Sequence, residues 1–262
     1  MKPSKLLRLI AITINLGMVV AVYFAVTNEL LALGFLALVL SKWRILAAHP
    51  RFWLRNFINN LLDIMFGVSI VALMHYYYLN QVQQLLLPGA STINWTILTL
   101  ALGLLVWQLV IKPRSSASWV ATQTVLGLAL SQAALWTYYP AQFDSGLVVV
   151  LLSSFSGFVA GYHFARQNPQ YEGRTITYAL LWTTIIAQFS WLGWLWNVAF
   201  IVGDDLVVPQ MVLFSGATGY YLQSLTIINA RSRVDRRKQF WQQSAYYIVL
   251  LLIIIGGSAF AN

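Results

Sequence analysis

The chain has 262 residues, of which 59% are hydrophobic and only 9% are charged, and its formal net charge is +9. Soluble domains carry about 25% charged residues. A chain as apolar as this one would expose large hydrophobic patches in water. The composition therefore favours a lipid bilayer as the surrounding medium. The absence of cysteine excludes disulfides, thiolate catalysis and cysteine metal sites.

Nine apolar segments are candidates for membrane helices, because about 20 apolar residues cross about 30 Å of hydrocarbon. The first has a basic start like a signal peptide, but its apolar run exceeds the roughly 7–15 residues of such a signal, so we expect an uncleaved helix. The second has the shortest apolar run, so the first two form either two spans or a re-entrant hairpin. In chain order the segments are Leu6–Val26, Leu30–Leu46, Leu61–Tyr78, Ile93–Ile111, Ala117–Tyr139, Leu147–Phe164, Thr175–Val202, Val208–Asn229 and Tyr246–Phe260.

These segments predict an all-α fold, a polytopic helical bundle that occupies residues 1–262 as a single transmembrane domain. The loops are short, and we expect no soluble domain. No proline interrupts a predicted membrane helix, so unbroken helices are expected.

Basic residues set the orientation, because Lys and Arg are retained on the cytoplasmic side. With the N-terminus inside, all 16 Lys and Arg residues fall in inner segments. Nine crossings then put the C-terminus outside. The short loops and the strong charge bias are typical of a protein of the bacterial cytoplasmic membrane. The densest basic stretch predicts contact with anionic lipid head groups rather than nucleic acid. It contains Arg231, Arg233, Arg236, Arg237 and Lys238.

Asp63 is the one carboxylate placed inside a predicted membrane helix, and intramembrane acids are functional candidates. His163 ends the sixth segment on the same inner side, so Asp63 and His163 are a candidate polar site. The alternatives are a histidine at the interface and an acid that suits the positive start of a helix. The residues that can cap this helix are Asn59 and Asn60, and those that can pair with the acid are Arg51 and Arg55. The three histidines lack metal-ligand spacing, so no metal site is predicted.

The seventh segment carries the stretch AQFSWLGWLWN, which is the best candidate for lining a cavity. Amides recognise neutral polar groups and indoles stack on rings, whereas the alternative is helix–helix hydrogen bonding and anchoring at the interface. The residues concerned are Gln188, Trp191, Trp194 and Asn197. The spacings Gly157-x-x-x-Gly161 and Ser215-x-x-x-Gly219 predict close helix packing.

The stretch KWRILAAHPRFWLRNFINN mixes basic and aromatic residues between the second and third segments. Such a composition predicts a segment that lies flat on the inner surface, with Phe52, Trp53 and Phe57 entering lipid. Basic residues there favour anionic lipid, and docking of a partner is the alternative.

The chain contains no P-loop, G-x-S-x-G or H-E-x-x-H motif, so we expect neither an enzyme nor a cofactor. The preferred hypothesis is a non-enzymatic scaffold or assembly component that packs against a membrane-protein partner or a second copy. A transporter or lipid-handling protein for a neutral or amphipathic substrate is the main alternative. A membrane enzyme that uses Asp63 and His163 is the third.

Overall fold

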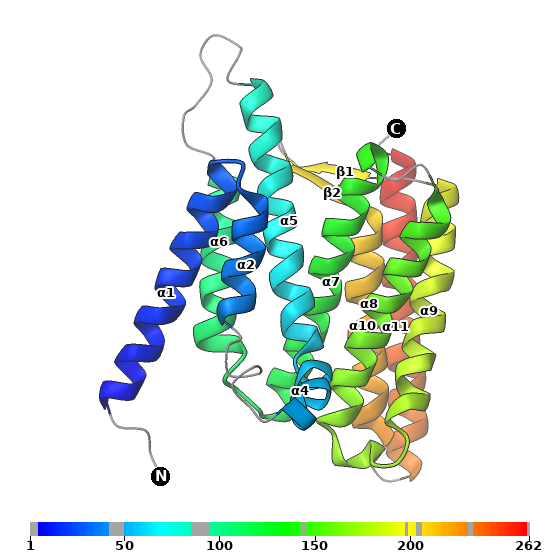
Figure 1. Ribbon diagram of the computed structural model, residues 1–262. Coiled ribbons are helices and arrows are strands. Elements are labelled where there is room, and N and C mark those ends of the chain that lie inside the picture. Colours follow the sequence, from blue (N-terminus) through cyan, green and yellow to red (C-terminus); the bar gives the residue numbers. More distant parts are fainter. Residues whose placement is uncertain are drawn as a thin grey trace. The chain divides into compact units, whose positions relative to one another are not determined.

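The structure is a computed structural model, and it describes residues 5–41, 50–84, 95–142, 145–196, 199–202, 206–229 and 233–260. The described chain is helical apart from one short two-stranded hairpin, so the predicted all-α fold is confirmed (Figure 1). The chain divides into two compact units, Met1–Ser115 and Ser116–Asn262. Within each unit, helices that are neighbours in sequence pack as pairs.

The first unit packs its helices as antiparallel neighbours, drawn in blue to blue-green in Figure 1. α1 contacts α2, α5 and α6, while α5 also contacts α2 and α6. A short π-helical turn, η2, continues α6. The elements are α1 (Lys5–Thr27), α2 (Leu31–Ser41), the 3-10 turn η1 (Pro50–Phe52), α4 (Trp53–Asn59), α5 (Leu61–Gln84), α6 (Trp95–Val106) and η2 (Trp107–Ile111).

α1 and α2 join through a tight turn at Glu29, which has a positive φ of 60°. The Leu30 N–H donates to the Ala25 carbonyl at 2.8 Å and the Glu29 N–H to the Val26 carbonyl at 3.1 Å, which is the Schellman pattern of a helix end. The described part of α2 has 11 residues and is about 16 Å long, roughly half the hydrocarbon thickness. Residues 42–46 of the predicted second segment lie outside the described ranges.

The second unit is built on four antiparallel helices. α7 packs on α8, α8 on α9, α9 on α10 and α10 on α7, while α11 packs on α10. Polar side chains join neighbouring helices, as where Gln223 Nε2 donates to the Ala121 carbonyl at 2.7 Å. The elements are α7 (Ala117–Gln142), α8 (Gly146–Arg166), the 3-10 turn η3 (Pro169–Tyr171), α9 (Thr175–Trp196), β1 (Ala199–Val202), β2 (Leu206–Pro209), α10 (Gln210–Asn229) and α11 (Arg233–Phe260).

Two predicted helix boundaries in this unit are wrong. The seventh segment ends as a helix at Trp196, and Ala199–Val202 instead pairs antiparallel with Leu206–Pro209. Both runs are rich in β-branched residues, which favour strands. The last helix begins at Arg233 rather than Tyr246, because Arg, Lys and Gln are good helix formers and extend it beyond the apolar part.

Glycines of α8 let α9 approach closely. A Cβ built on Gly161 would lie 2.7 Å from Trp182 Cγ, and one on Gly157 would lie 2.9 Å from Ile186 Cβ. At the other end of α8, the Trp194 indole occupies the space beside Gly146. The packing interpretation of Gly157-x-x-x-Gly161 is therefore confirmed, and its partner helix belongs to the same chain.

Three helices among the described residues are long and apolar enough to cross a membrane, which agrees with membrane association. These spans are Leu61–Asn80, Gly146–Arg166 and Arg237–Gly256. Only 6% of the last span is buried, because α10 is the main helix on which α11 packs. Exposed apolar side chains such as Leu252 and Ile253 suit a lipid surround.

We predict that Gly161→Ala lowers the free energy of unfolding by about 1–3 kcal/mol, because the new methyl group overlaps Trp182 and the α9 backbone. The matched control is Gly216→Ala in α10, where a Cβ meets nothing within 4 Å. SDS titration of both variants in the same detergent measures the difference. Equal stability of the two variants would show that the close α8–α9 approach is not required.

Candidate functional site

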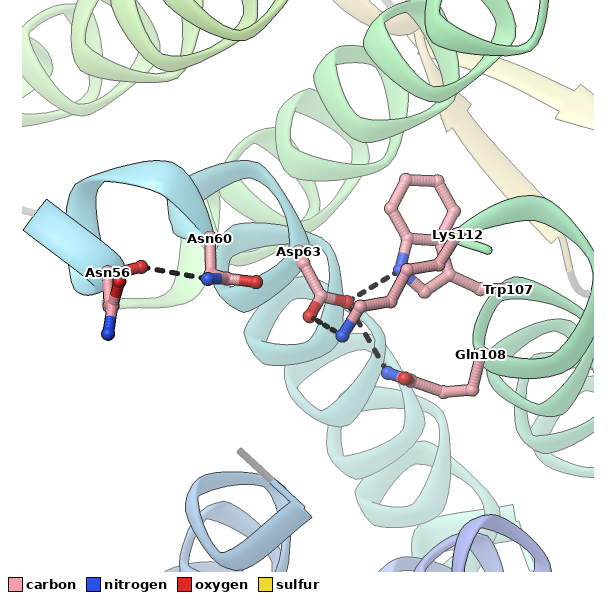
Figure 2. A network of polar contacts seen from close by, with 6 residues as sticks. All are labelled: Asn56, Asn60, Asp63, Trp107, Gln108 and Lys112. Atoms are coloured by element: carbon pink, nitrogen blue, oxygen red, sulfur yellow. Dashed lines mark hydrogen bonds and ion pairs between the residues drawn. The ribbon is translucent and has the colours of Figure 1, made fainter. Parts of the chain in front are cut away.

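Asp63 lies in the first turn of α5 and is 7% exposed (Figure 2). Asn60, just before α5, forms the corner between α4 and α5, and its side chain donates backward to the Asn56 carbonyl at 2.8 Å. An acid at the start of a helix interacts favourably with the positive end of the helix dipole. The predicted helix-start position of Asp63 is thus confirmed.

Both carboxylate oxygens of Asp63 accept hydrogen bonds from the end of the α6–η2 helix (Figure 2). Trp107 Nε1 donates to Oδ1 at 2.8 Å, and Gln108 Nε2 approaches the same oxygen at 3.4 Å. Lys112 Nζ forms an ion pair with Oδ2 at 2.5 Å. The sequence pointed to Arg51 or Arg55 as the partner of Asp63, whereas the structure pairs it with Lys112.

A π-helical turn brings these donors to one side of their helix. On a regular α-helix, Trp107 and Lys112 would point about 140° apart, because each residue turns the helix by about 100°. Here the Lys112 N–H donates to the Trp107 carbonyl at 2.9 Å, the bond of a π-turn, and both side chains reach Asp63. The helix remains continuous through this turn but is locally widened, and π-turns frequently occur at functional sites.

Aromatic packing shields one side of the carboxylate. The ring of Phe66, one turn after Asp63 on α5, stacks on Trp107 with centroids 3.7 Å apart and planes 10° apart. Trp107 is 1% exposed, while the side chain of Lys112 is 36% exposed. Low-dielectric surroundings strengthen the hydrogen bonds to the carboxylate. The arrangement clamps the start of α5 to the end of α6 and leaves a partly accessible ammonium at the rim.

His163 occupies the second unit, and its Nε2 lies 3.1 Å from Gln123 Oε1 on α7. An amide oxygen accepts, so this contact requires the proton on Nε2. Asp63 and His163 belong to different compact units, and a joint polar site remains a prediction. Among the described residues, no group of three or more His, Cys, Asp or Glu side chains is placed to hold a metal ion.

The seventh-segment candidates divide into two groups. Gln188 and Trp191 line a shallow, open depression of about 520 Å³ between α8 and α9. Trp194 instead turns toward Gly146 and meets Trp191 edge to face, with centroids 5.0 Å apart. Asn197 lies outside the described residues. The other residues that line the depression are Val150, Ala187 and Leu192.

Buried amides elsewhere in the second unit join helices. Gln132 is fully buried, donates to Ser156 Oγ at 2.6 Å and accepts from Trp136 Nε1 at 3.1 Å. The bond of Gln132 to Ser156 and that of Gln223 to Ala121 each join two helices. The buried amides are thus engaged with protein groups, whereas Gln188 faces the depression.

The basic stretch begins at Arg231, which lies outside the described residues, and continues into α11. Arg233, Arg236, Arg237 and Lys238 therefore belong to the first turns of a helix rather than to a loop. Arg237 and Lys238 are exposed, and contact with anionic head groups stays a prediction.

We predict that Trp107→Phe lowers the free energy of unfolding by about 1–3 kcal/mol, because a bond to a charged acceptor is lost while the stack on Phe66 is kept. The matched control, Trp95→Phe, changes a residue that is 67% exposed and should alter stability by less than about 0.5 kcal/mol. SDS titration measures both variants. A loss at Trp107 no larger than at Trp95 would contradict a role of the indole N–H.

Comparison of the chain with family models, with curated proteins and with solved structures finds no match. A function for this protein therefore has to be argued from its own residues. Two features carry that argument: the clamp formed by Asp63, Trp107, Gln108 and Lys112, and the apolar depression between α8 and α9.

Proposed function

We propose that this protein is a multi-pass integral membrane protein that acts as a non-enzymatic scaffold or assembly component. The observation that carries this proposal is the depression between α8 and α9, which is lined almost entirely by apolar atoms. Trp191 and Leu192 at this surface are 47% and 46% exposed. Such a surface suits an apolar side chain of a partner helix.

The use of buried polar groups supports this proposal over catalysis. The Asp63 carboxylate holds an ammonium and an indole N–H, and Gln132 binds Ser156 and Trp136. These contacts stabilise helix pairs and leave the groups engaged with protein partners. A catalytic acid or base needs instead to reach a substrate proton at hydrogen-bond distance.

We further propose nine membrane crossings in the bacterial cytoplasmic membrane, with the N-terminus inside and the C-terminus outside. Alternation of helix direction in the second unit supports this topology. Because α8, α9, α10 and α11 alternate in direction, Arg166, Arg174 and Arg237 gather at the same end of the unit. A shared end for basic residues is what retention of Lys and Arg in the cytoplasm requires.

Lipid handling or transport of an amphipathic substrate is the second candidate. The volume of the depression, about 520 Å³, falls within the roughly 300–1,000 Å³ of small-molecule sites. Its open form and almost wholly apolar lining suit an acyl chain. Both functions use the same surface, so one experiment can separate them.

We predict that a photo-crosslinking amino acid at Trp191 captures one discrete protein in native membranes. The matched control is Leu181 on the same helix, which is 46% exposed and does not line the depression. Mass spectrometry of the adducts identifies the occupant, including a second copy of this chain. Lipid adducts at Trp191 alone would support the second candidate, and identical adducts at both positions would contradict a specific surface.

We predict that reporters fused after Asp205 and after Arg237 report opposite sides of the membrane. In the proposed topology Asp205 follows the seventh crossing and Arg237 follows the eighth. Alkaline phosphatase and green fluorescent protein fusions, active outside and inside respectively, provide the measurement. Placement of both reporters on one side would contradict the nine-crossing topology.

A further inference from the structure

We infer that Pro50–Asn59, comprising η1 and α4, is a surface anchor that lies on an anionic lipid leaflet. In this arrangement Trp53, Leu54 and Phe57 enter the hydrocarbon, while Arg51 and Arg55 bind lipid phosphates. The inference rests on the proposed membrane location of the protein, and it adds a specific lipid class and the residues that recognise it.

The exposed surface of α4 is amphipathic. Trp53, Leu54 and Phe57 are 43%, 71% and 47% exposed. At about 100° per residue these three positions fall within an arc of about 100° around the helix, while Arg55 and Asn59 lie on the other side. A helix with one apolar and one polar face, both exposed, is suited to the boundary between hydrocarbon and head groups.

The neighbouring helix puts α4 at that boundary. The candidate membrane span Leu61–Asn80 begins directly after Asn60, the single residue between α4 and α5. The Asn60 N–H donates to the Phe57 carbonyl at 3.0 Å and its side chain donates to the Asn56 carbonyl, so the corner is fixed by hydrogen bonds. α4 therefore lies at the end of a span.

The clamp at Asp63 holds this corner against the rest of the first unit (Figure 2). Asp63 follows Asn60 by less than one helical turn, and its bonds to Trp107 and Lys112 fix the start of α5. The start of α5, which directly follows the corner with α4, is consequently held by protein contacts. A surface presented in this way loses less conformational entropy when it binds.

Charge selects the kind of surface that α4 meets. At this end of the first unit the described side chains include the cations Arg51, Arg55, Lys112 and Arg114 beside the acid Asp63. Arg51 is exposed, and its guanidinium lies 4.7 Å from the Phe52 ring centroid. Guanidinium groups bind phosphate in bidentate fashion, so anionic phospholipid is the occupant that matches both the apolar face and the cations.

The experiment exploits the absence of cysteine from the chain, which makes an introduced thiol unique. Nitroxide labels on Leu54→Cys and, as the control on the other face, Asn59→Cys are compared in nanodiscs by their accessibility to oxygen and to a water-soluble nickel complex. The discs contain phosphatidylcholine alone or mixed with phosphatidylglycerol. We expect a severalfold higher oxygen-to-nickel ratio at Leu54 than at Asn59, and a further increase with phosphatidylglycerol.

Charge dependence is tested in the same label background with Arg51→Gln and Arg55→Gln combined. We expect this variant to lose the increase caused by phosphatidylglycerol. Three outcomes would overturn the inference: equal depth of the label in both lipids, nickel access to Leu54 in both lipids, or spin–spin coupling between labels of two copies.

A third label at Val68→Cys, within the candidate span and 41% exposed in the unmodified chain, tests membrane location separately. Nickel access there would contradict the proposed function itself.

Discussion

The structure depends on the need to satisfy polar groups where water is scarce. In an apolar surround a buried donor or acceptor is stabilised by a partner within the protein. The carboxylate of Asp63 does so through Trp107 and Lys112, and the amide of Gln132 does so through Ser156 and Trp136. Each of these two groups joins two helices. These polar contacts thus specify which helices pack together, while the apolar side chains form surfaces that could pack against many different helices.

Close packing provides the second level of specificity. Gly157 and Gly161 bring α8 within side-chain reach of Ile186 and Trp182, so α9 has one favourable register on α8. Hydrophobic burial cannot drive this contact in lipid, because the acyl chains are as apolar as the side chains they would replace. Van der Waals contact across small residues remains as the driving force. The depression lies at the surface of this closely packed α8–α9 pair.

Apolar length predicted where most described helices lie, and small-residue spacing predicted the α8–α9 contact. The acid at the start of α5 was predictable as well, because Asp63 follows a polar corner and precedes an apolar run. Its partner was not, since the reach of Lys112 depends on a π-turn that leaves no mark in the hydrophobic pattern. The strands at Ala199–Val202 and Leu206–Pro209 were missed for a related reason, because short apolar β-branched runs read equally well as helix ends.

The π-turn has an evolutionary consequence. A π-turn holds one residue more than the α-helical turn it replaces, so deleting a residue between Trp107 and Ile111 would restore a regular helix. The apolar character of the segment would survive, and the lysine would follow Trp107 by four residues, about 40° away around a regular helix. The clamp on Asp63 therefore tolerates this deletion, whereas a regular α-helix over the present sequence would separate the two side chains by about 140°. The extra residue and the π-turn are tied to each other, so descendants of this sequence keep the clamp with both or with neither.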